Sequence, residues 1–323
     1  MKKVLSLSLV MALLFSVMAI LPASADEINH DYKKPKYLTM GTASVGGGYY
    51  VAGLAICDVL TNHLGITCTA QNTGGATENN TLIQDGEVDF ALTQSSMAYA
   101  AANGEHPYDS VLDNVSAVMG SITKGVFQVV TLEGSGIESM ADLKGRTVSL
   151  GSAGGGAVNV ANEVLNLLYG FTTDDMNATY SSYADAASNL QDGKVDAVVW
   201  QAAIPSTGLS ELVATKGSAV KFVSLTDEEV EKVLNAYSYY SRYEIQPEEY
   251  GTAEGGVTVN LNNLIVCRSD MDAGLVYDIT KTLYENFGEV TVPNSWAAET
   301  CADVPIALHP GAEAFYKEIG LIK

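Results

Sequence analysis

The chain has 323 residues, a formal net charge of −21, and 47% hydrophobic against 17% charged residues, a composition typical of a folded globular protein. Its three arginines (Arg146, Arg242 and Arg268) provide no basic surface of the kind that nucleic acid or an anionic membrane attracts, so neither is an expected partner. At about 150 residues per domain, the length predicts two lobes.

The first 25 residues have the pattern of a secretory signal peptide. Lys2 and Lys3 are followed by an apolar run over 4–21, and Ala23-Ser24-Ala25 is a small-residue cleavage site. The alternative is a membrane anchor, although the run is barely long enough to span a bilayer. We expect export, with the signal peptide spanning 1–25 and a soluble mature chain in the periplasm or another extracytoplasmic space.

The mature chain alternates short apolar strands with helices. In the first lobe, a glycine-rich loop over 41–48 connects the first strand to the first helix, and Gly65 is placed to end that helix. The predicted elements, in chain order, are strand 37–40, helix 50–64, strand 66–71, helix 77–84 and strand 88–93, then strand 147–150, helix 159–168, helix 184–190 and strand 195–200. This order predicts a parallel sheet that is covered by helices on both faces.

Part of the pattern occurs twice, roughly 110 residues apart. The sequence over 38–52 resembles that over 148–161, with three consecutive glycines in each. Gln84-Asp85-Gly86-Glu87-Val88-Asp89 likewise matches Gln191-Asp192-Gly193-Lys194-Val195-Asp196. Two matches at nearly the same spacing indicate two lobes of one α/β design.

The two glycine-rich loops predict a binding cleft. Parallel sheets bind ligands beyond the carboxyl ends of their strands, where both loops lie. Each loop opens a helix, so unpaired N–H groups and the positive end of the helix dipole face the same space. Glycines allow that backbone to approach a ligand closely. A small carboxylate or another anion is therefore the expected ligand, held by local amides in an otherwise acidic protein.

Export permits disulfides, and the chain has four cysteines. Proximity in the sequence favours Cys57–Cys68, which would connect a helix to the next strand, and Cys267–Cys301. The alternative is that some of them are buried free thiols. No Cys-x-x-Cys occurs, so a zinc or redox site is not expected.

Sequence motifs of common enzymes and nucleotide-binding proteins are not found. Neither loop reads G-x-G-x-x-G, no G-x-x-x-x-G-K-[ST] or H-E-x-x-H occurs, and Ser152 is not in a G-x-S-x-G motif. Paired catalytic carboxylates stay open, because acidic residues are plentiful. We expect no enzyme activity, no cofactor and no bound metal.

The ordered set of motifs resembles the TAXI solute-binding proteins of TRAP (tripartite ATP-independent periplasmic) transporters. The resemblance covers most of the mature chain, from about Tyr37 to Gly320. It rests on Gly41-Thr42 with Gly46-Gly47-Gly48-Tyr49-Tyr50, on Gly74 to Asn79, on Gly86 to Leu92 with Gln94-Ser95, on Asp142 to Val148, on Asp192 to Ala197 with Pro205, on Tyr250 and Val257 to Val266, and on Leu308 to Ala312 with Phe315-Tyr316 and Gly320.

This resemblance implies a two-lobed α/β fold of the type II periplasmic-binding-protein kind, with parallel-rich sheets and a ligand cleft between the lobes. The expected division is 37–122 with 251–323 for lobe 1 and 123–250 for lobe 2, with hinge crossovers near 121–126 and 237–250. The implied function is capture of a small carboxylate or amino acid, glutamate or a related organic acid, by lobe closure and delivery to the membrane permease subunits. We expect the protein to act as a monomer.

Candidate ligand contacts follow from matching positions in the motifs. They are Thr42, Ser44, Gly46, Gly47, Tyr49, Tyr50, Asn72, Thr73, Gly74, Gln94, Ser95, Ser152, Gly155, Gly156, Trp200, Gln201 and Arg242. Of Tyr49 and Tyr50, one is expected to face the cleft while the other packs. Trp200 is either a cleft wall or plain core, and the tyrosines at 237–240 are either a cleft wall or the face of a hinge strand.

The chain departs from the family pattern at two positions. Gly154-Gly155-Gly156-Ala157 stands where family members often carry Ser-Gly-Thr, and Ala76 stands where they often carry serine. The loss of two hydroxyls favours a less polar ligand than glutamate, or a carboxylate held through backbone N–H groups. Arg242 is the preferred guanidinium if one is used.

Three other functions are consistent with the same fold: the binding protein of an ABC importer, a soluble sensor that presents its ligand to a membrane receptor, and an exported enzyme without a sequence motif. His309-Pro310-Gly311 is interpreted as a structural turn, followed by a C-terminal helix from about Ala312 that packs on lobe 1.

Overall fold

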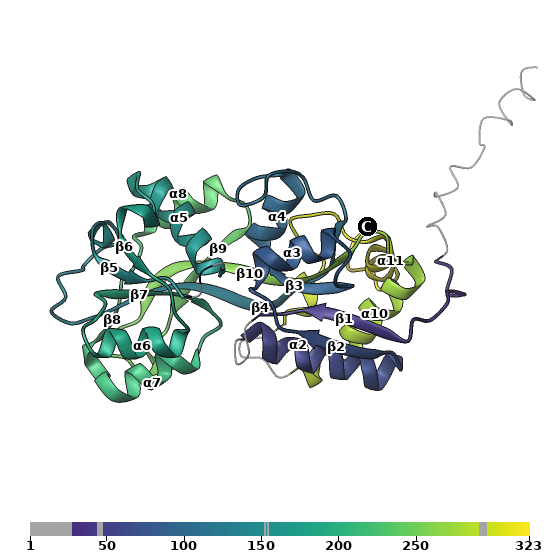
Figure 1. The fold of residues 1–323 in the computed structure, drawn as a ribbon, viewed down its shortest axis with the longest axis horizontal. Helices are drawn as coiled ribbons and strands as arrows, with labels where there is room; N and C mark the ends of the chain where they lie inside the picture. The colour runs from purple at the N-terminus through teal and green to yellow at the C-terminus, as the bar shows by residue number, and fades with distance from the viewer. Residues whose placement is uncertain (1–27, 44–47, 152, 154, 291–295) are drawn as a thin grey trace, which may run out of the picture.

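The computed structural model describes residues 28–43, 48–151, 153, 155–290 and 296–323. The predicted signal peptide lies outside the described residues. Within them, no helix is long and apolar enough to cross a membrane. Figure 1 shows two lobes side by side, and two long strands run from one lobe into the other.

The first lobe follows the predicted order of strands and helices. Its elements are β1 (Tyr37–Gly41), α2 (Gly48–Val59) with a π-helical turn over Leu60–Leu64, β2 (Thr67–Gln71), α3 (Ala76–Gln84), β3 (Phe90–Gln94), α4 (Ser95–Asn103), the first half of β4 (Val115–Leu132), the second half of β10 (Gly256–Arg268), α10 (Ala273–Asn286) and α11 (Pro310–Glu318). Gly65 ends the first helix with a φ of +68°, in the left-handed region that glycine adopts without strain.

The second lobe repeats this order. It contains β5 (Thr147–Ser149), α5 (Gly156–Tyr169), β6 (Asn177–Thr179), α6 (Tyr183–Gln191), β7 (Ala197–Ala202), α7 (Thr207–Lys216), β8 (Val220–Phe222), α8 (Asp227–Ala236), β9 (Tyr240–Ile245) and α9 (Pro247–Tyr250). The strand order is β2-β1-β3-β10-β4 in lobe 1 and β6-β5-β7-β4-β8 in lobe 2, so the two lobes have the same topology. The internal repeat is therefore a repeat of the fold.

The sheet is parallel-rich, as the sequence predicted, but it also contains antiparallel pairs that the sequence did not specify. β1 pairs in parallel with β2 and β3, but β10 is antiparallel to β3 and to β4, and β4 is antiparallel to β7 and β8. The difference arises because each lobe takes one strand from a segment that enters from the other lobe, and such a strand runs against its neighbours.

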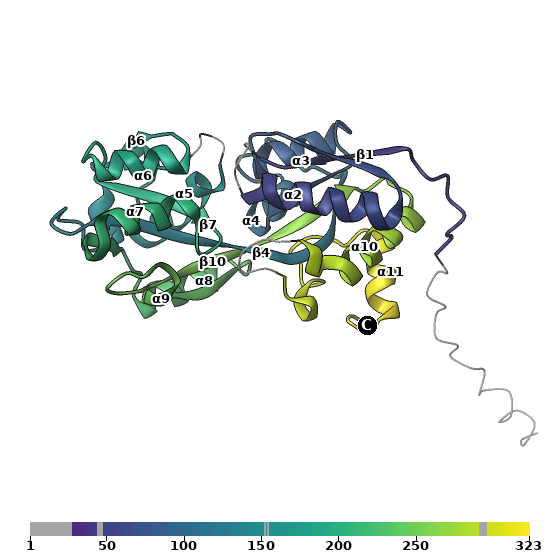
Figure 2. The same cartoon turned by 90° about the horizontal axis from the view of Figure 1, so that it is seen from below.

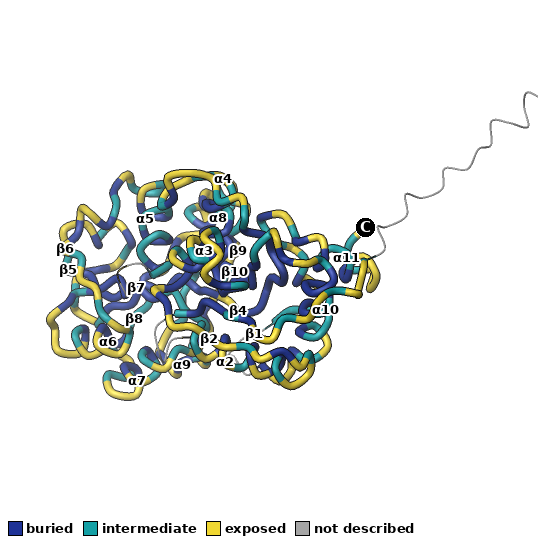
Figure 3. Tube along the Cα trace, turned by 45° about the vertical axis from the view of Figure 1, so that its right-hand side comes forward, coloured by how far each residue is buried: buried dark blue, intermediate teal, exposed yellow. Residues whose placement is uncertain are grey.

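Each face of the sheet carries its own hydrophobic core. In lobe 1, α2, α10 and α11 pack on one face, while α3 and α4 pack on the other. In lobe 2, α5 and α8 share one face, and α6 and α7 share the other. Figure 3 shows the strands largely buried and the outer helices edged with exposed residues. Burial of apolar side chains on both faces explains the near-continuous apolar strands.

β4 and β10 connect the lobes, and their residues change from apolar to polar where the strands pass from one lobe to the other. The ends of both strands supply apolar residues to the two cores. Between these ends, Thr123 pairs with Asn263 and Lys124 pairs with Asn262. Figure 2 shows the same two strands bridging the lobes from below.

We propose this polar middle, 123–125 with 262–263, as the pivot between the lobes. The first part lies within the predicted crossover 121–126. The second lies further along the chain than the predicted 237–250, because β9 in that range pairs with the first half of β10 beside lobe 2. The division into 37–122 with 251–323 and 123–250 stays a prediction.

The repeated Asp-Gly-x-Val-Asp sequence braces neighbouring strands in both lobes. Asp89 Oδ2 accepts a hydrogen bond from the N–H of Thr39 at 2.7 Å, and its own N–H donates to the Thr39 carbonyl. Asp196 makes the same two contacts with Thr147, at 2.8 and 2.7 Å. The motif is therefore structural and lies far from the loops that open α2 and α5.

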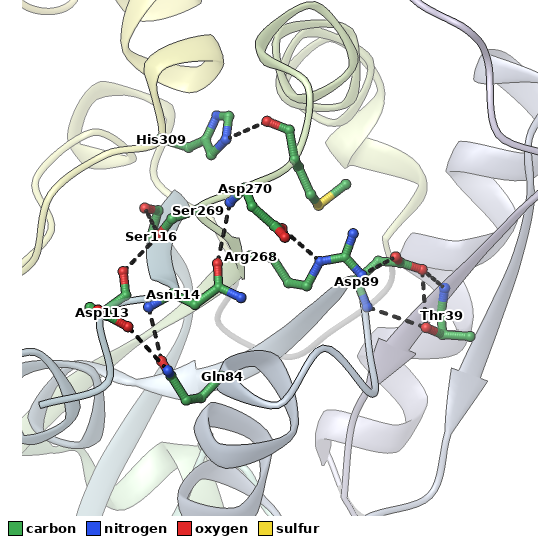
Figure 4. Close-up of polar contacts among 11 residues, drawn as sticks. Thr39, Gln84, Asp89, Asp113, Asn114, Ser116, Arg268, Ser269, Asp270 and His309 are labelled. Atoms are coloured by element: carbon green, nitrogen blue, oxygen red, sulfur yellow. Dashed lines mark hydrogen bonds and ion pairs between the residues drawn. The ribbon is translucent and has the colours of Figure 1, made fainter. Parts of the chain in front are cut away.

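In lobe 1 this brace extends into the polar network of Figure 4. Arg268 pairs with Asp89 at 3.1 Å and with Asp270 at 2.9 Å. His309 is buried, begins α11, and its Nε2 lies 3.1 Å from the Met271 carbonyl. The structural interpretation of His309 and the packing of the C-terminal helix on lobe 1 are both confirmed.

The structure confirms one predicted disulfide and corrects the other. Cys57 in α2 is bonded to Cys68 in β2, so a helix is connected to the next strand. Cys267 and Cys301 are both buried and free, so the predicted Cys267–Cys301 bond is wrong. Cys301 instead lies against the hydroxyl of Tyr316 within the lobe 1 core.

Replacing Asp196 with alanine should lower the free energy of unfolding by about 1–3 kcal/mol, because the N–H of Thr147 loses its side-chain acceptor. Denaturant unfolding measures this. Asp192→Ala is the control, since Asp192 is exposed and pairs with Lys194 on the surface. Equal midpoints for the two variants would contradict the proposed brace.

Thiol alkylation tests the cysteine assignment. In the native protein no cysteine should react with iodoacetamide, because burial raises the pKa of the Cys267 thiol and denies access to both free thiols. In denaturant without reductant, Cys267 and Cys301 should both react, as read by mass spectrometry. A denatured chain with no reactive thiol would instead show that these two cysteines are bonded.

Candidate functional site

The first turns of the lobe 1 loops are held by internal hydrogen bonds. Thr42 is buried, and its hydroxyl donates to the Gln71 carbonyl at 2.6 Å. Thr73 is also buried and donates to the Thr42 carbonyl at 3.0 Å and to Asn79 Oδ1 at 2.7 Å. These two candidate hydroxyls therefore shape the loops and do not point into free space.

The buried residue that organises these loops, Asn79, was missed by the sequence analysis. Its Nδ2 donates to the carbonyls of Thr42 and Leu92 at 2.7 and 2.6 Å, which fixes the ends of β1 and β3 relative to each other. A polar residue on the inner face of a short helix after two glycines was the available signal.

A carboxylate of the protein itself binds an amide of the loop just before α3. Glu78 Oε2 accepts the N–H of Gly74 at 2.6 Å. Asn72, another candidate, donates through Nδ2 to the Ala43 carbonyl at 2.8 Å. An incoming carboxylate at Gly74 would therefore compete with Glu78 for the same amide.

Four predicted residues do meet between the lobes: Tyr49, Gln94, Gly156 and Gln201. Gln94 ends β3 with only 2% of its surface exposed. A methyl group built on Gly156 would overlap the side-chain oxygens of both Gln94 and Gln201. The lobes thus approach closely here, and glycine is needed at position 156 for that contact.

Tyr49 and Gln201 connect this meeting point to the pivot. Tyr49 donates through its hydroxyl to Asn263 Oδ1 at 2.6 Å, and Asn263 donates to Thr123 Oγ1 at 2.7 Å. The side-chain nitrogen of Gln201 is buried and has no hydrogen-bond partner among the described residues. A buried donor without an acceptor is a natural contact for a ligand oxygen.

Helix α4 carries further contacts from lobe 1 to lobe 2. Ser95, a predicted contact, lies 3.4 Å through Oγ from the carbonyl of Tyr239. The rings of Tyr99 and Tyr239 have centroids 5.5 Å apart, and Asn159 Nδ2 lies 3.3 Å from the sulfur of Met97. Asn159 and Tyr239 were not predicted, although the tyrosines at 237–240 had been considered as a cleft wall.

Two candidates lie elsewhere. Arg242 is paired with Asp227 at 2.7 Å and with Glu244 at 3.0 Å on the surface of lobe 2, so it does not join the other candidates. Trp200 is fully buried in the lobe 2 core with its ring 5.8 Å from that of Tyr183. Of the two interpretations of Trp200, the structure supports core packing.

Some candidates have no described contact. Tyr50 is half-buried in the first turn of α2. Ser44, Gly46, Gly47 and Ser152 lie outside the described residues. Gly155 borders a hollow of about 200 Å³ between the lobes, with Thr77 and Pro107 from lobe 1 and Ala153, Val158, Asn159 and Tyr180 from lobe 2.

Within the described residues, no group of three or more acidic, histidine or cysteine side chains is placed to hold a metal ion.

These observations define the class of fold. Two lobes of identical strand order, joined by two crossing strands and meeting at their βα loops, have the type II periplasmic-binding-protein fold, as the sequence predicted. The NMT1-like family matches residues 40–320, so the chain belongs to the NMT1-like family.

Solved structures match this chain at low sequence identity. XAC2383 from Xanthomonas citri, bound to ATP, has a TM-score of 0.51 at 12% identity over 87% of this chain and 89% of that one. The alkanesulfonate-binding protein SsuA from Xanthomonas axonopodis pv. citri, bound to MOPS, has a TM-score of 0.47 at 15% identity over 90% and 82%. The substrate-binding protein of an amino acid ABC transporter has a TM-score of 0.45 at 14% identity over 79% and 95%.

Gly156→Ala tests the close approach of the lobes. The added methyl group should push Gln94 and Gln201 apart and increase the radius of gyration in small-angle scattering, while the unfolding free energy changes by less than about 1 kcal/mol. Gly48→Ala is the matched control, because Gly48 opens α2 as Gly156 opens α5 and has open space around it. The same radius for both variants would show that Gly156 does not limit lobe approach.

Proposed function

We propose that this protein is an extracytoplasmic solute-binding subunit of a TRAP transporter of the TAXI type. It captures a small carboxylate or amino acid between its lobes and presents the closed form to the membrane permease. One observation carries the proposal. The polar side chains of Gln94 and Gln201, from different lobes, meet at Gly156, near the place where the paired strands β4 and β10 pass from one lobe to the other.

Lobe closure is the proposed mechanism. A ligand that contacts both lobes binds the closed arrangement more tightly than the open one and shifts the population toward it. Rotation about the polar pivot needs no change in either core. The residues that β4 and β10 supply to one core all lie on one side of the pivot, and those that they supply to the other core lie on the other side. The permease then distinguishes the loaded protein by its shape. One chain supplies both walls, which supports a monomer.

Neutral groups hold the ligand in this proposal. The candidate contacts that meet between the lobes are amides, hydroxyls and glycine backbone, and Arg242 is occupied by two carboxylates. The carboxylate would be held by loop N–H groups at the start of α2 and α5, by the free side-chain nitrogen of Gln201, and by Ser95. Ser44, Gly46, Gly47 and Ser152 stay proposed contacts on the sequence alone.

The expected outcome is that at least one compound from a panel of amino acids and organic acids raises the melting temperature of the mature chain and reduces its radius of gyration. Differential scanning fluorimetry and small-angle scattering measure the two effects. Ligand at 100 times its Kd adds about 2.7 kcal/mol of stability, which is readily detected. Stabilisation without compaction would contradict lobe closure.

The type of transporter is tested by the neighbouring genes. A multi-span permease beside the gene supports the TRAP assignment. An ATPase would indicate the alternative, an ABC importer, and a histidine kinase would indicate a sensor component.

A further inference from the structure

A second hollow of about 200 Å³ lies between the lobes on the side of α4 and α5. Lobe 1 contributes the loop after α4, and lobe 2 contributes one face of α5 and the segment between α8 and β9. The lining residues are Glu105, His106, Asn159, Asn162, Glu163, Tyr237 and Tyr239. None of them is among the ligand contacts predicted from the sequence.

One wall of this hollow is aromatic. The rings of Tyr237 and Tyr239 are stacked with centroids 5.5 Å apart, and Tyr240 lies behind them at 5.9 and 5.1 Å. Tyr99 reaches Tyr239 from lobe 1. The face of a tyrosine ring carries negative potential and attracts a cation within about 6 Å of its centroid.

The charge of the hollow is also negative. Glu163 and Glu105 both line it, and neither lysine nor arginine is among the described lining residues. Glu163 accepts a hydrogen bond from the Tyr240 hydroxyl at 2.5 Å. No ion pair of Glu163 with a basic side chain is found within the described part of the chain, so its carboxylate has hydrogen bonds but no countercharge.

Burial without a countercharge changes the chemistry of Glu163. Burial raises the pKa of this carboxyl to about 7, the hydroxyls of Tyr240 and Tyr239 lower it, and the negative charge of Glu105 raises it. Near neutral pH, burial therefore favours a proton on this carboxyl more than on an exposed glutamate. A bound cation stabilises the ionised carboxylate of Glu163, so the cation and the proton compete for this group.

We propose that this hollow binds the ammonium group of a small organic cation, with Glu163 as its counterion and the rings of Tyr237 and Tyr239 as part of its wall. An anion is disfavoured there by the two carboxylates. The inference rests on the proposed solute-binding function and adds the chemical class of the solute, an amine or the ammonium end of an amino acid. Because Glu105 and His106 come from lobe 1, the bound cation contacts both lobes and favours closure.

Choline is the probe, and 3,3-dimethylbutan-1-ol is its uncharged counterpart of nearly the same shape. Isothermal titration of the mature chain at pH 8 should show binding of choline and at least tenfold weaker binding of the alcohol. A hydrophobic cavity without a cation site would bind the two alike, and that result would overturn the proposal.

Two variants locate the site. Glu163→Gln keeps the shape and a hydrogen-bonding partner for Tyr240 but removes the charge, and should weaken choline binding at least tenfold. Glu318→Gln is the control, because Glu318 at the end of α11 accepts a similar hydrogen bond from Tyr277 of α10, and neither residue lines the hollow. Equal affinity in the two variants would overturn the assignment of Glu163. Melting temperatures of both variants show that they are folded.

The pH dependence gives a second readout. Since ionised Glu163 binds the cation, choline affinity should rise about 30-fold between pH 5.5 and pH 8.5 for a group that titrates near pH 7. Glu105, His106, Tyr237, Tyr239 and Tyr240 also face this site. Glu163→Gln should remove most of the rise. An unchanged rise would show that Glu163 is not its source and would contradict the proposal.

The panel of acids and amino acids separates this inference from the proposed function. Compaction by a carboxylate that lacks an amino group, with no binding of choline, would overturn the cation site and leave the solute-binding function standing. Binding of choline that depends on Glu163, without compaction by any compound, would support the site and contradict lobe closure. No binding by any compound would contradict both.

Discussion

The antiparallel pair of β4 and β10 is the interaction on which the rest of the molecule depends. Each strand places apolar side chains in the cores of both lobes, so neither lobe is complete without the segment that passes through it. Between these apolar ends, Thr123 and Asn263 are polar, hydrogen-bond to each other and lie where the strands pass from one lobe to the other. The strands therefore hold the lobes together and leave a place at which they can turn.

The internal repeat has two physical origins. The Asp-Gly-x-Val-Asp sequence recurs because both lobes need the same carboxylate brace between neighbouring strands, as Asp89 and Asp196 show. The glycine-rich loops recur because each connects a strand to a helix at the face where the lobes meet. Gly156 demonstrates the second requirement, since any side chain there would overlap Gln94 and Gln201. One repeat is thus structural, and the other belongs to the candidate site.

Charge distinguishes the two regions between the lobes. Each arginine has a structural contact: Arg146 donates to the Gly136 carbonyl, Arg242 pairs with Asp227 and Glu244, and Arg268 pairs with Asp89 and Asp270. The proposed carboxylate contacts are consequently amides and hydroxyls. The hollow beside Glu163 is acidic and aromatic, which suits the opposite charge. A zwitterionic amino acid has both groups, so the two proposals are compatible in one class of solute.

The sequence by itself predicted the alternation of strands and helices and the two-lobed repeat, because local periodicity and glycine positions are encoded locally, and proximity along the chain favoured the Cys57–Cys68 bond. Gln94, Gly156 and Gln201 were candidates through the family resemblance, and the tertiary structure showed that they meet. Only the tertiary structure decided the mixed direction of the sheet, the free Cys267 and Cys301, the surface position of Arg242 and the burial of Trp200. Each of these depends on which distant segment packs alongside, as when Asp227 and Glu244 neutralise Arg242 or when Tyr183 covers Trp200. Glu163 belongs to the same group, since its surroundings come from three separate segments of the chain.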